Sequence, residues 1–157
     1  MGEAPYEQRR GDFLVSTDRA RLDLAVVHGF LAGSYWSPGI PLETLTRAIA
    51  HSLPFGLYAL GPPGAARQVG FARVTTDYAT FGYLADVFVD EQLRGQGLGR
   101  WLMDVLFAHP QLQGFRRWML VTRDAHGLYA PQGFTALSHP ERVMERVVPD
   151  IYRRGPR

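Results

Sequence analysis

Three glycines alternate with other residues in the stretch Arg94-Gly95-Gln96-Gly97-Leu98-Gly99. An apolar segment rich in aromatic and β-branched residues ends before it near Val89, and apolar residues at helical spacing begin at Leu98. We therefore expect a strand, a glycine loop and a helix in that order. Glycines let the backbone turn tightly and bring its N–H groups close to an anion, and a helix N-terminus favours negative charge. The stretch predicts a loop that binds a pyrophosphate.

The spacing of these glycines excludes two other kinds of pyrophosphate loop. The dinucleotide fingerprint G-x-G-x-x-G requires a third glycine where this chain has Arg100. The nucleotide P-loop requires a lysine, and the chain contains none, since all 17 of its basic residues are arginine. We call residues 94–99 the glycine loop.

Upstream of the glycine loop, the pattern predicts two helices followed by three strands. Asp18 is the expected N-cap of the first helix, and the second begins at Pro41, carries Leu53 on its apolar face and is closed by Pro54. The pattern of apolar residues then becomes typical of strands. Turn residues separate these strands, and short turns between strands favour antiparallel hairpins. The expected strands cover residues 55–60, 68–77 and 81–89.

Downstream of the loop, shorter elements are expected. The helix that starts at Leu98 should stop at Pro110. A strand over residues 118–122, a helix over 124–132 with Gly133 as its stop, and a last strand over 142–148 follow. We expect one mixed α/β domain over residues 1–157, with flexible ends at 1–12 and 152–157.

Composition limits the class of protein. A chain of 157 residues, 46% of them hydrophobic, fits one globular domain. It has no cysteine, which excludes a disulfide framework, a zinc–thiolate site and a cysteine nucleophile. No apolar run approaches the ~20 residues of a membrane span, and the first residues do not read as a signal peptide. With a net charge of only +2, we expect a cytoplasmic protein that binds neither nucleic acid nor membranes.

The glycine loop and its surroundings resemble the GNAT superfamily, the GCN5-related N-acetyltransferases, in their bacterial single-domain form. Arg94, Gly97 and Gly99 match the loop pattern of that family, and the match extends upstream through residues 83–89 and downstream through Leu128-Tyr129 and Gly133-Phe134. The resemblance implies an α/β (α+β) fold with a central, mixed and mostly antiparallel sheet of about six to seven strands, flanked by about four helices. It also implies a single N-acetyltransferase domain that uses acetyl-CoA as acetyl donor.

The same resemblance implies which residues bind the donor. The backbone of the strand before the loop should bond the pantetheine arm like an added strand, and the loop amides should hold the pyrophosphate beside arginine counter-charges. Many family members place an asparagine after the strand that follows the loop helix, where this chain has Thr122 instead. The expected cofactor-binding residues are Val87, Phe88, Val89, Arg94, Gly95, Gln96, Gly97, Leu98, Gly99, Arg100 and Thr122.

Acetyl transfer to an amine needs a proton acceptor for the ammonium and favours an acid for the departing thiolate. Tyr129 matches the family position of that acid, with a packed core aromatic as the alternative, and Pro131 two residues later is expected to disturb its helix. Asp86 is the leading proton acceptor, directly or through a water; the alternative is an acid paired with a neighbouring arginine. Some relatives carry an acidic pair here, and this chain has Ala85 as its first member.

The acceptor site is expected where the resemblance places it, at the first two helices, their connection and the three-stranded meander. Tyr35, Trp36 and Tyr78 lie in those connections and are candidates for stacking on an amine, with plugging the edge of the core as the alternative. The five dispersed histidines give no metal-ligand spacing, so we expect no metal.

These expectations combine into direct attack of an amine, of a small molecule rather than a protein, on acetyl-CoA in a ternary complex. A different class of function stays open, in which the same fold binds acyl-CoA as a sensor or partner-binding module with little turnover. The sequence does not exclude assembly of the chain as a homodimer.

Overall fold

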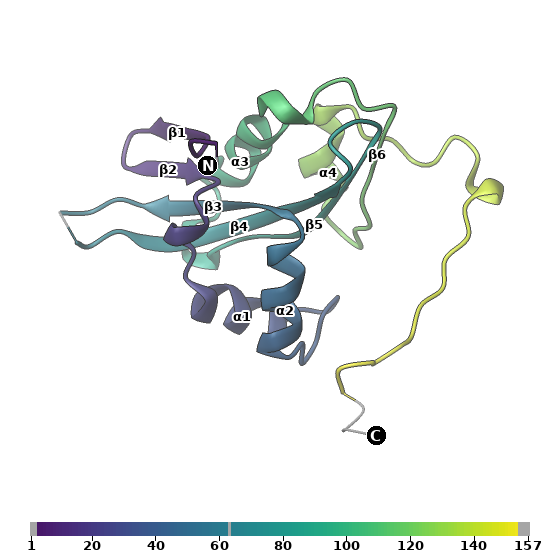
Figure 1. The fold of residues 1–157 in the computed structure, drawn as a ribbon, viewed down its shortest axis with the longest axis horizontal. Coiled ribbons are helices and arrows are strands. Elements are labelled where there is room, and N and C mark those ends of the chain that lie inside the picture. Colours follow the sequence, from purple (N-terminus) through teal and green to yellow (C-terminus); the bar gives the residue numbers. More distant parts are fainter. Residues whose placement is uncertain (1–2, 63, 154–157) are drawn as a thin grey trace.

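The centre of the molecule is a six-stranded sheet with the strand order β1-β2-β3-β4-β5-β6 (Figure 1). The computed structural model describes residues 3–62 and 64–153. Strands β1 to β5 pair antiparallel with their neighbours, and β6 lies parallel to β5. The strands are β1 (Glu7–Arg10), β2 (Phe13–Ser16), β3 (Leu53–Ala59), β4 (Arg67–Thr76), β5 (Phe81–Val89) and β6 (Arg117–Met119).

Helices cover both faces of this sheet. Helices α1 (Leu24–Ala32) and α2 (Leu42–Ala50) lie on one face, and α3 (Leu98–Phe107) and the short α4 (His126–Tyr129) lie on the other (Figure 1). Because side chains alternate along a strand, each face supplies its own apolar core. Phe88 packs with α1 and α2, whereas the larger cluster joins the sheet to α3 and includes Tyr129. The predicted α/β class, with six strands and four helices, is confirmed.

The sequence correctly located the three-stranded meander and the helix after the glycine loop. Several boundaries were wrong. The strand expected over residues 118–122 is Arg117–Met119, and the helix expected over residues 124–132 is α-helical only at His126–Tyr129, before a 3-10 turn. Asp18 caps a short 3-10 turn, while Asp23 is the N-cap of α1, its side chain accepting from the N–H of Val26. Leu53 and Pro54 do not close α2 but begin β3, because α2 already ends at Ala50 and the chain pairs with β4 at once.

The two ends of the chain also differ from expectation. Residues 7–10 were expected to be loose, yet they form β1, whose backbone pairs with β2 in a hairpin that turns at Gly11. The strand expected over residues 142–148 is not part of the sheet: the chain turns at the 3-10 segment Pro140–Arg142 and runs on extended, away from β6 (Figure 1). At the end of the chain, Tyr152 packs against the α1–α2 core, and the remainder of the expected loose end, residues 154–157, lies outside the described residues.

Candidate active site

One side of β5 is open along most of its length. β6 pairs with β5 only between Phe81–Tyr83 and Arg117–Met119, and beyond these residues no described strand lies beside β5 on that side. Its backbone N–H and C=O groups near the predicted residues Val87, Phe88 and Val89 therefore face a gap in the sheet. Such an edge accepts an extended chain as an added strand.

A bulge in the meander lies next to this gap. Phe71 pairs with Phe88 and Arg73 pairs with Ala85, so a single residue of β4 stands opposite two residues of β5. Asp86 is one of those two, and its φ of 58° lies in the left-handed region. Bulges bend a strand and re-aim its side chains, and a non-glycine residue at positive φ is held there by its surroundings.

The glycine loop leads from the open edge of β5 into α3. Gly95 and Gly97 have φ of 86° and 75°, which only glycine adopts without strain. Gly97 is the N-cap of α3 and supplies no side-chain cap, so the first N–H groups of the helix face outward without a side-chain acceptor. A Cβ added at Gly95 or Gly97 would meet no atom within 4 Å. The loop thus presents helix-terminal amides to an open surface, as an anion site requires.

Arginine side chains surround this loop. Arg94 lies 4.0 Å from Glu91, with both side chains largely exposed, and Arg100 is exposed on the first turn of α3. Arg10 was not expected here: its Nη2 donates to the carbonyl oxygen of Gln96 at 3.3 Å, and its guanidinium lies 5.0 Å from the centre of the Trp101 ring. Arg10 and Gln96 are 86 positions apart, so no local pattern could have revealed this contact.

Tyr129 ends α4 and packs in the core cluster that joins the sheet to α3. Pro131 follows in a 3-10 turn, Ala130–Gln132, that Gly133 terminates at a φ of 92°. The proline therefore ends the α-helix without exposing Tyr129, which is only 8% exposed. Burial raises the pKa of the Tyr129 phenol to about 12, and the nearby Tyr35 phenol adds to the rise. Tyr129 thus keeps its proton at neutral pH and can donate it.

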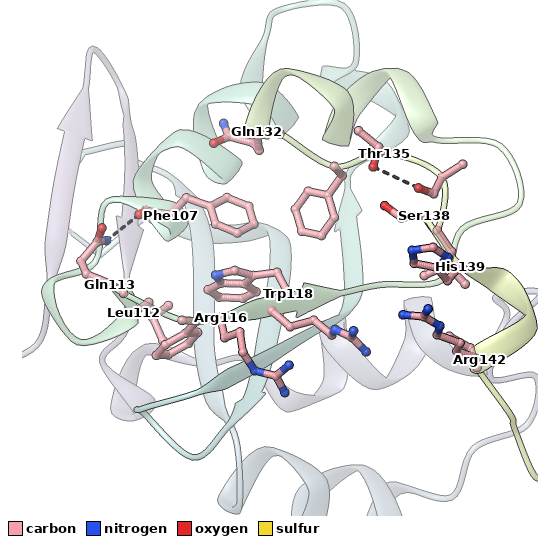
Figure 2. A pocket seen from close by; sticks show the side chains of 18 residues that line it. Phe107, Leu112, Gln113, Arg116, Trp118, Gln132, Thr135, Ser138, His139 and Arg142 are labelled. Carbon is pink, nitrogen blue, oxygen red and sulfur yellow. Dashed lines mark hydrogen bonds between the residues drawn. The ribbon is translucent and has the colours of Figure 1, made fainter.

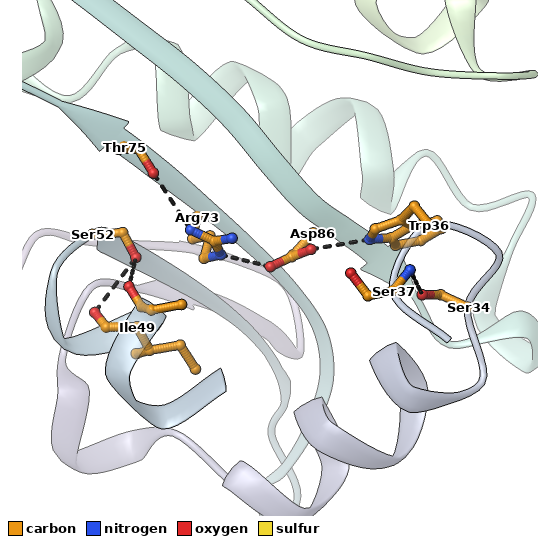
Figure 3. A network of polar contacts seen from close by, with 9 residues as sticks. Ser34, Trp36, Ser37, Ile49, Ser52, Arg73, Thr75 and Asp86 are labelled. Atoms are coloured by element: carbon orange, nitrogen blue, oxygen red, sulfur yellow. Dashed lines mark hydrogen bonds and ion pairs between the residues drawn. The ribbon is translucent and has the colours of Figure 1, made fainter. Parts of the chain in front are cut away.

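Asp86 is buried and bonded through both of its oxygens (Figure 3). Arg73 Nε lies 2.5 Å from Oδ2, and Trp36 Nε1 donates to Oδ1 at 3.0 Å. The arginine pairing that the sequence left as an alternative is therefore present. The second partner, Trp36, belongs to the α1–α2 connection, so Asp86 ties that connection to the bulge of the sheet.

The α1–α2 connection also reaches the segment that follows β6. The N–H of Arg123 donates to the Tyr35 hydroxyl at 3.0 Å, and the Arg123 guanidinium lies 3.9 Å from the centre of the Tyr35 ring. The rings of Tyr35 and Trp36 meet edge to face at 5.0 Å. The structure thus places Tyr35 and Trp36 between Asp86 of β5 and Arg123, which follows β6.

Two predicted residues have other surroundings. Tyr78 is half-exposed in the β4–β5 hairpin and lines a separate shallow recess of about 230 Å³ with Arg19 and Ser52. It makes no contact with Trp36 in the described residues. Thr122 accepts a hydrogen bond from the N–H of Ala125 at 3.0 Å and so orients the start of α4. Across residues 3–62 and 64–153, no cluster of three or more acidic or histidine side chains is arranged to hold a metal ion.

Comparisons with known proteins agree with this geometry. Residues 64–136, from β4 to the turn after α4, match the family model of the acetyltransferase (GNAT) domain. The Gibberella zeae protein named Putative acetyltransferase FG08082 is 36% identical over 143 residues, which cover 80% of each chain. The chain belongs to the GNAT family of acetyltransferases.

Solved GNAT-fold structures extend the likeness. A GNAT-family protein from Xanthomonas campestris pv. campestris is 51% identical and superposes with a TM-score of 0.83, over 89% of this chain and 96% of that one. An acetyltransferase-like protein from Clostridium acetobutylicum, solved with acetyl-CoA, has a TM-score of 0.59 over 79% of this chain and 86% of that one. At 16% identity, that second likeness shows the fold alone. Within the described part of this GNAT chain, no helix is long and apolar enough to cross a membrane.

Proposed function

We propose that this GNAT chain is an acetyl-CoA-dependent N-acetyltransferase that moves an acetyl group to the primary amine of a small-molecule acceptor, by direct attack in a ternary complex. The observation that carries the proposal is the continuity of the open β5 edge with the glycine loop. An extended amide-bearing arm suits the edge, and a pyrophosphate suits the amides at the start of α3. Acetyl-CoA carries both groups in that order.

The residues around the loop fit such a donor. The surface before Gly95 and Gly97 is open, and Arg94 and Arg100 are exposed beside it to offset phosphate charge. Arg10 bonds the loop through the carbonyl oxygen of Gln96, so this contact does not use the loop N–H groups. Acetyl-CoA would supply the acetyl group and the leaving thiolate.

Tyr129 is the proposed general acid. Its phenol remains protonated because burial raises its pKa. Unlike the Tyr58 hydroxyl, the Tyr129 hydroxyl is not fully enclosed without a hydrogen-bond partner in the described residues. It can therefore give its proton to a departing sulfur that lies over the gap. A positioned acid contributes roughly 10²- to 10⁴-fold to the rate.

Asp86 is the proposed proton acceptor, acting through a water. Each carboxylate oxygen has a second acceptor position besides the one used by Arg73 or Trp36, so a water can still bond to it. The aromatic rings of Tyr35 and Trp36 form the proposed wall for the acceptor.

Release of free thiol from acetyl-CoA, measured across a library of small amines, peptides and proteins, tests the function. We expect turnover with one class of small primary amine, together with calorimetric binding of acetyl-CoA. Binding without thiol release from any acceptor would favour the sensor or partner-binding alternative. Absence of acetyl-CoA binding by the folded protein would overturn the proposal.

A further inference from the structure

Arg123 lies over one ring of the proposed acceptor wall, which Tyr35 and Trp36 form. Its guanidinium carbon is 3.9 Å from the centre of the Tyr35 ring, and its backbone N–H donates to the Tyr35 hydroxyl at 3.0 Å. A guanidinium that stacks on a ring uses its face, so the N–H donors along its edge remain available for hydrogen bonds. The Arg123 side chain is therefore oriented by an uncharged partner while its donors can still bind a ligand.

The charge of Arg123 is only loosely paired within the chain. Asp124 Oδ2 lies 3.7 Å from Arg123 Nη2, and each of the two side chains is 66% exposed. An exposed pair of this kind contributes little, so a ligand can replace the aspartate. Arg73, by contrast, is 20% exposed and lies 2.5 Å from the buried Asp86. Of these two arginines, Arg123 is therefore the one whose charge a bound acceptor can use.

The two ends of the acceptor wall carry opposite charges. At the Trp36 end, the indole bonds Asp86, the proposed proton acceptor (Figure 3). At the other end, Arg123 lies on Tyr35, and Tyr35 is close enough to Tyr129 to add to the rise in the pKa of that phenol. An arginine so near the proposed acid is within reach of an acceptor that is bound for reaction. The wall thus suits a molecule with a cationic and an anionic end.

We propose, on the basis of the proposed acetyltransferase function, that the acceptor is an amino acid, a small primary amine whose carboxylate Arg123 binds. Guanidinium and carboxylate pair through two parallel N–H···O bonds, which also fix the direction of the bound molecule. The amine then lies toward the Asp86 end of the wall, and its nitrogen forms the bond to the acetyl carbon. The thioester C–S bond breaks, the proton of the amine passes through a water to Asp86, and the sulfur takes a proton from Tyr129. A diamine would instead bring a second cation toward Arg123, which is unfavourable.

The first test compares each amino acid with its own carboxamide as acceptor. Glycine, β-alanine and the common L-amino acids, each with its amide, are assayed by thiol release from acetyl-CoA, together with simple diamines. We expect kcat/KM to favour the carboxylate in at least one pair by roughly 10- to 100-fold, the range for hydrogen bonds to a charged group. Amides that react as fast as the acids, or diamines that react faster, would overturn the proposed acceptor class.

Replacing Arg123 by Gln tests which residue binds the carboxylate. Arg123→Gln should raise KM for the preferred acid by a similar factor and leave KM for its amide and for acetyl-CoA unchanged. The backbone N–H of residue 123 still bonds the Tyr35 hydroxyl, so the wall should stay in place. Arg142→Gln is the matched control, since the Arg142 side chain is 72% exposed and lies 4.0 Å from the adjacent Glu141. Arg142 lines a separate groove beside Trp118 (Figure 2), so its variant should keep the preference for the acid.

The same variants distinguish failure of this inference from failure of the acetyltransferase function. An equal loss for acid and amide in Arg123→Gln would mean that Arg123 only supports Tyr35. A raised KM for acetyl-CoA would assign Arg123 to the donor. Either result overturns the carboxylate contact while the acetyltransferase function stands. Acetyl-CoA binding without thiol release from any acceptor would overturn that function and this inference with it, and circular dichroism checks that every variant is folded.

Discussion

The indole Nε1 of Trp36 donates a 3.0 Å hydrogen bond to Oδ1 of Asp86, a residue 50 positions later in the chain. Asp86 also bonds Arg73 on β4, so one carboxylate joins the bulge of the meander to the α1–α2 connection. Trp36 in turn contacts Tyr35, whose hydroxyl accepts from the N–H of Arg123 beyond β6. The loop that lines the proposed acceptor site is therefore fastened to both sides of the gap.

Replacing Asp86 by Asn separates catalysis from structure. As a proton acceptor, the carboxylate must be ionised, so Asp86→Asn should lower kcat/KM and flatten the acidic limb of its pH profile. Stability should also fall, by less than the ~3–5 kcal/mol of breaking a fully buried pair, because the Arg73 side chain is 20% exposed. Trp36→Phe, which removes the other partner and keeps the carboxylate, should retain the acidic limb. A lower melting temperature with normal turnover per folded molecule would leave Asp86 a purely structural role.

Replacing Tyr129 by Phe should lower turnover roughly 10²- to 10⁴-fold with little change in acetyl-CoA affinity, because it removes a proton donor and little contact area. With a pKa of about 12, Tyr129 should cause no loss of turnover at neutral or mildly alkaline pH in the unchanged enzyme. Steady-state kinetics and calorimetry measure the two quantities. Tyr6→Phe, a partly buried tyrosine that packs on His109, is the control. Unchanged turnover of Tyr129→Phe would show that Tyr129 serves only as a packed aromatic residue of the core.

Replacing Gly97 by Val should abolish acetyl-CoA binding. A side chain there would stand in the open space before the start of α3, and a β-branched residue at a φ of 75° is strained by about 1–3 kcal/mol. Gly114→Val is the matched control, since Gly114 has a φ of 78° and equally open surroundings away from the glycine loop. Both variants should lose similar stability, and only Gly97→Val should lose affinity in calorimetry. Equal affinities would contradict the role of the loop.

His109 should make the protein less stable in mild acid. It is buried, its Nδ1 accepts from the N–H of Gln111, and burial lowers its pKa below the usual 6.5. The folded state thus disfavours the protonated ring, so this stabilising contribution is present above pH ~6.5 and is lost as the pH falls toward the folded-state pKa. Melting temperatures from neutral to mildly acidic pH should show the decline. His109→Gln should flatten it, whereas replacement of the exposed His126 by Gln should not.

Replacing Tyr58 by Phe should stabilise the protein. The Tyr58 hydroxyl is buried in β3 and has no hydrogen-bond partner among the described residues, and burial raises the pKa of the phenol above its ordinary value. An unsatisfied buried hydroxyl costs about 1–3 kcal/mol, which the phenylalanine avoids. Chemical denaturation measures the gain. Tyr83→Phe, in the partly exposed part of β5, should change stability little, and a loss of stability in Tyr58→Phe would show that the hydroxyl is satisfied in solution.

Much of the fold was readable because the signals are local. The glycine loop, the three strands of the meander and the stop at Gly133 follow from backbone freedom and side-chain period within a few residues. Pro54 gave a wrong end for α2, because a proline after an apolar helical pattern normally ends a helix. Here it occupies the second position of β3. The strand expected over residues 142–148 failed for a related reason: period predicts an extended conformation but not a partner.

The sequence by itself determined the glycine loop, the helical segment that carries Tyr129 and the placing of aromatic residues on the α1–α2 connection, since each depends on neighbours along the chain. Only the tertiary structure decided that Asp86 bonds both Arg73 and Trp36, that Arg10 supports the loop through Gln96, and that Tyr78 lies apart from Trp36. The bonds of Asp86 and Arg10 join residues separated by 13 to 86 positions. They arise because packing two helical layers on a twisted, bulged sheet brings distant segments together, and no single stretch of sequence records which ones will meet.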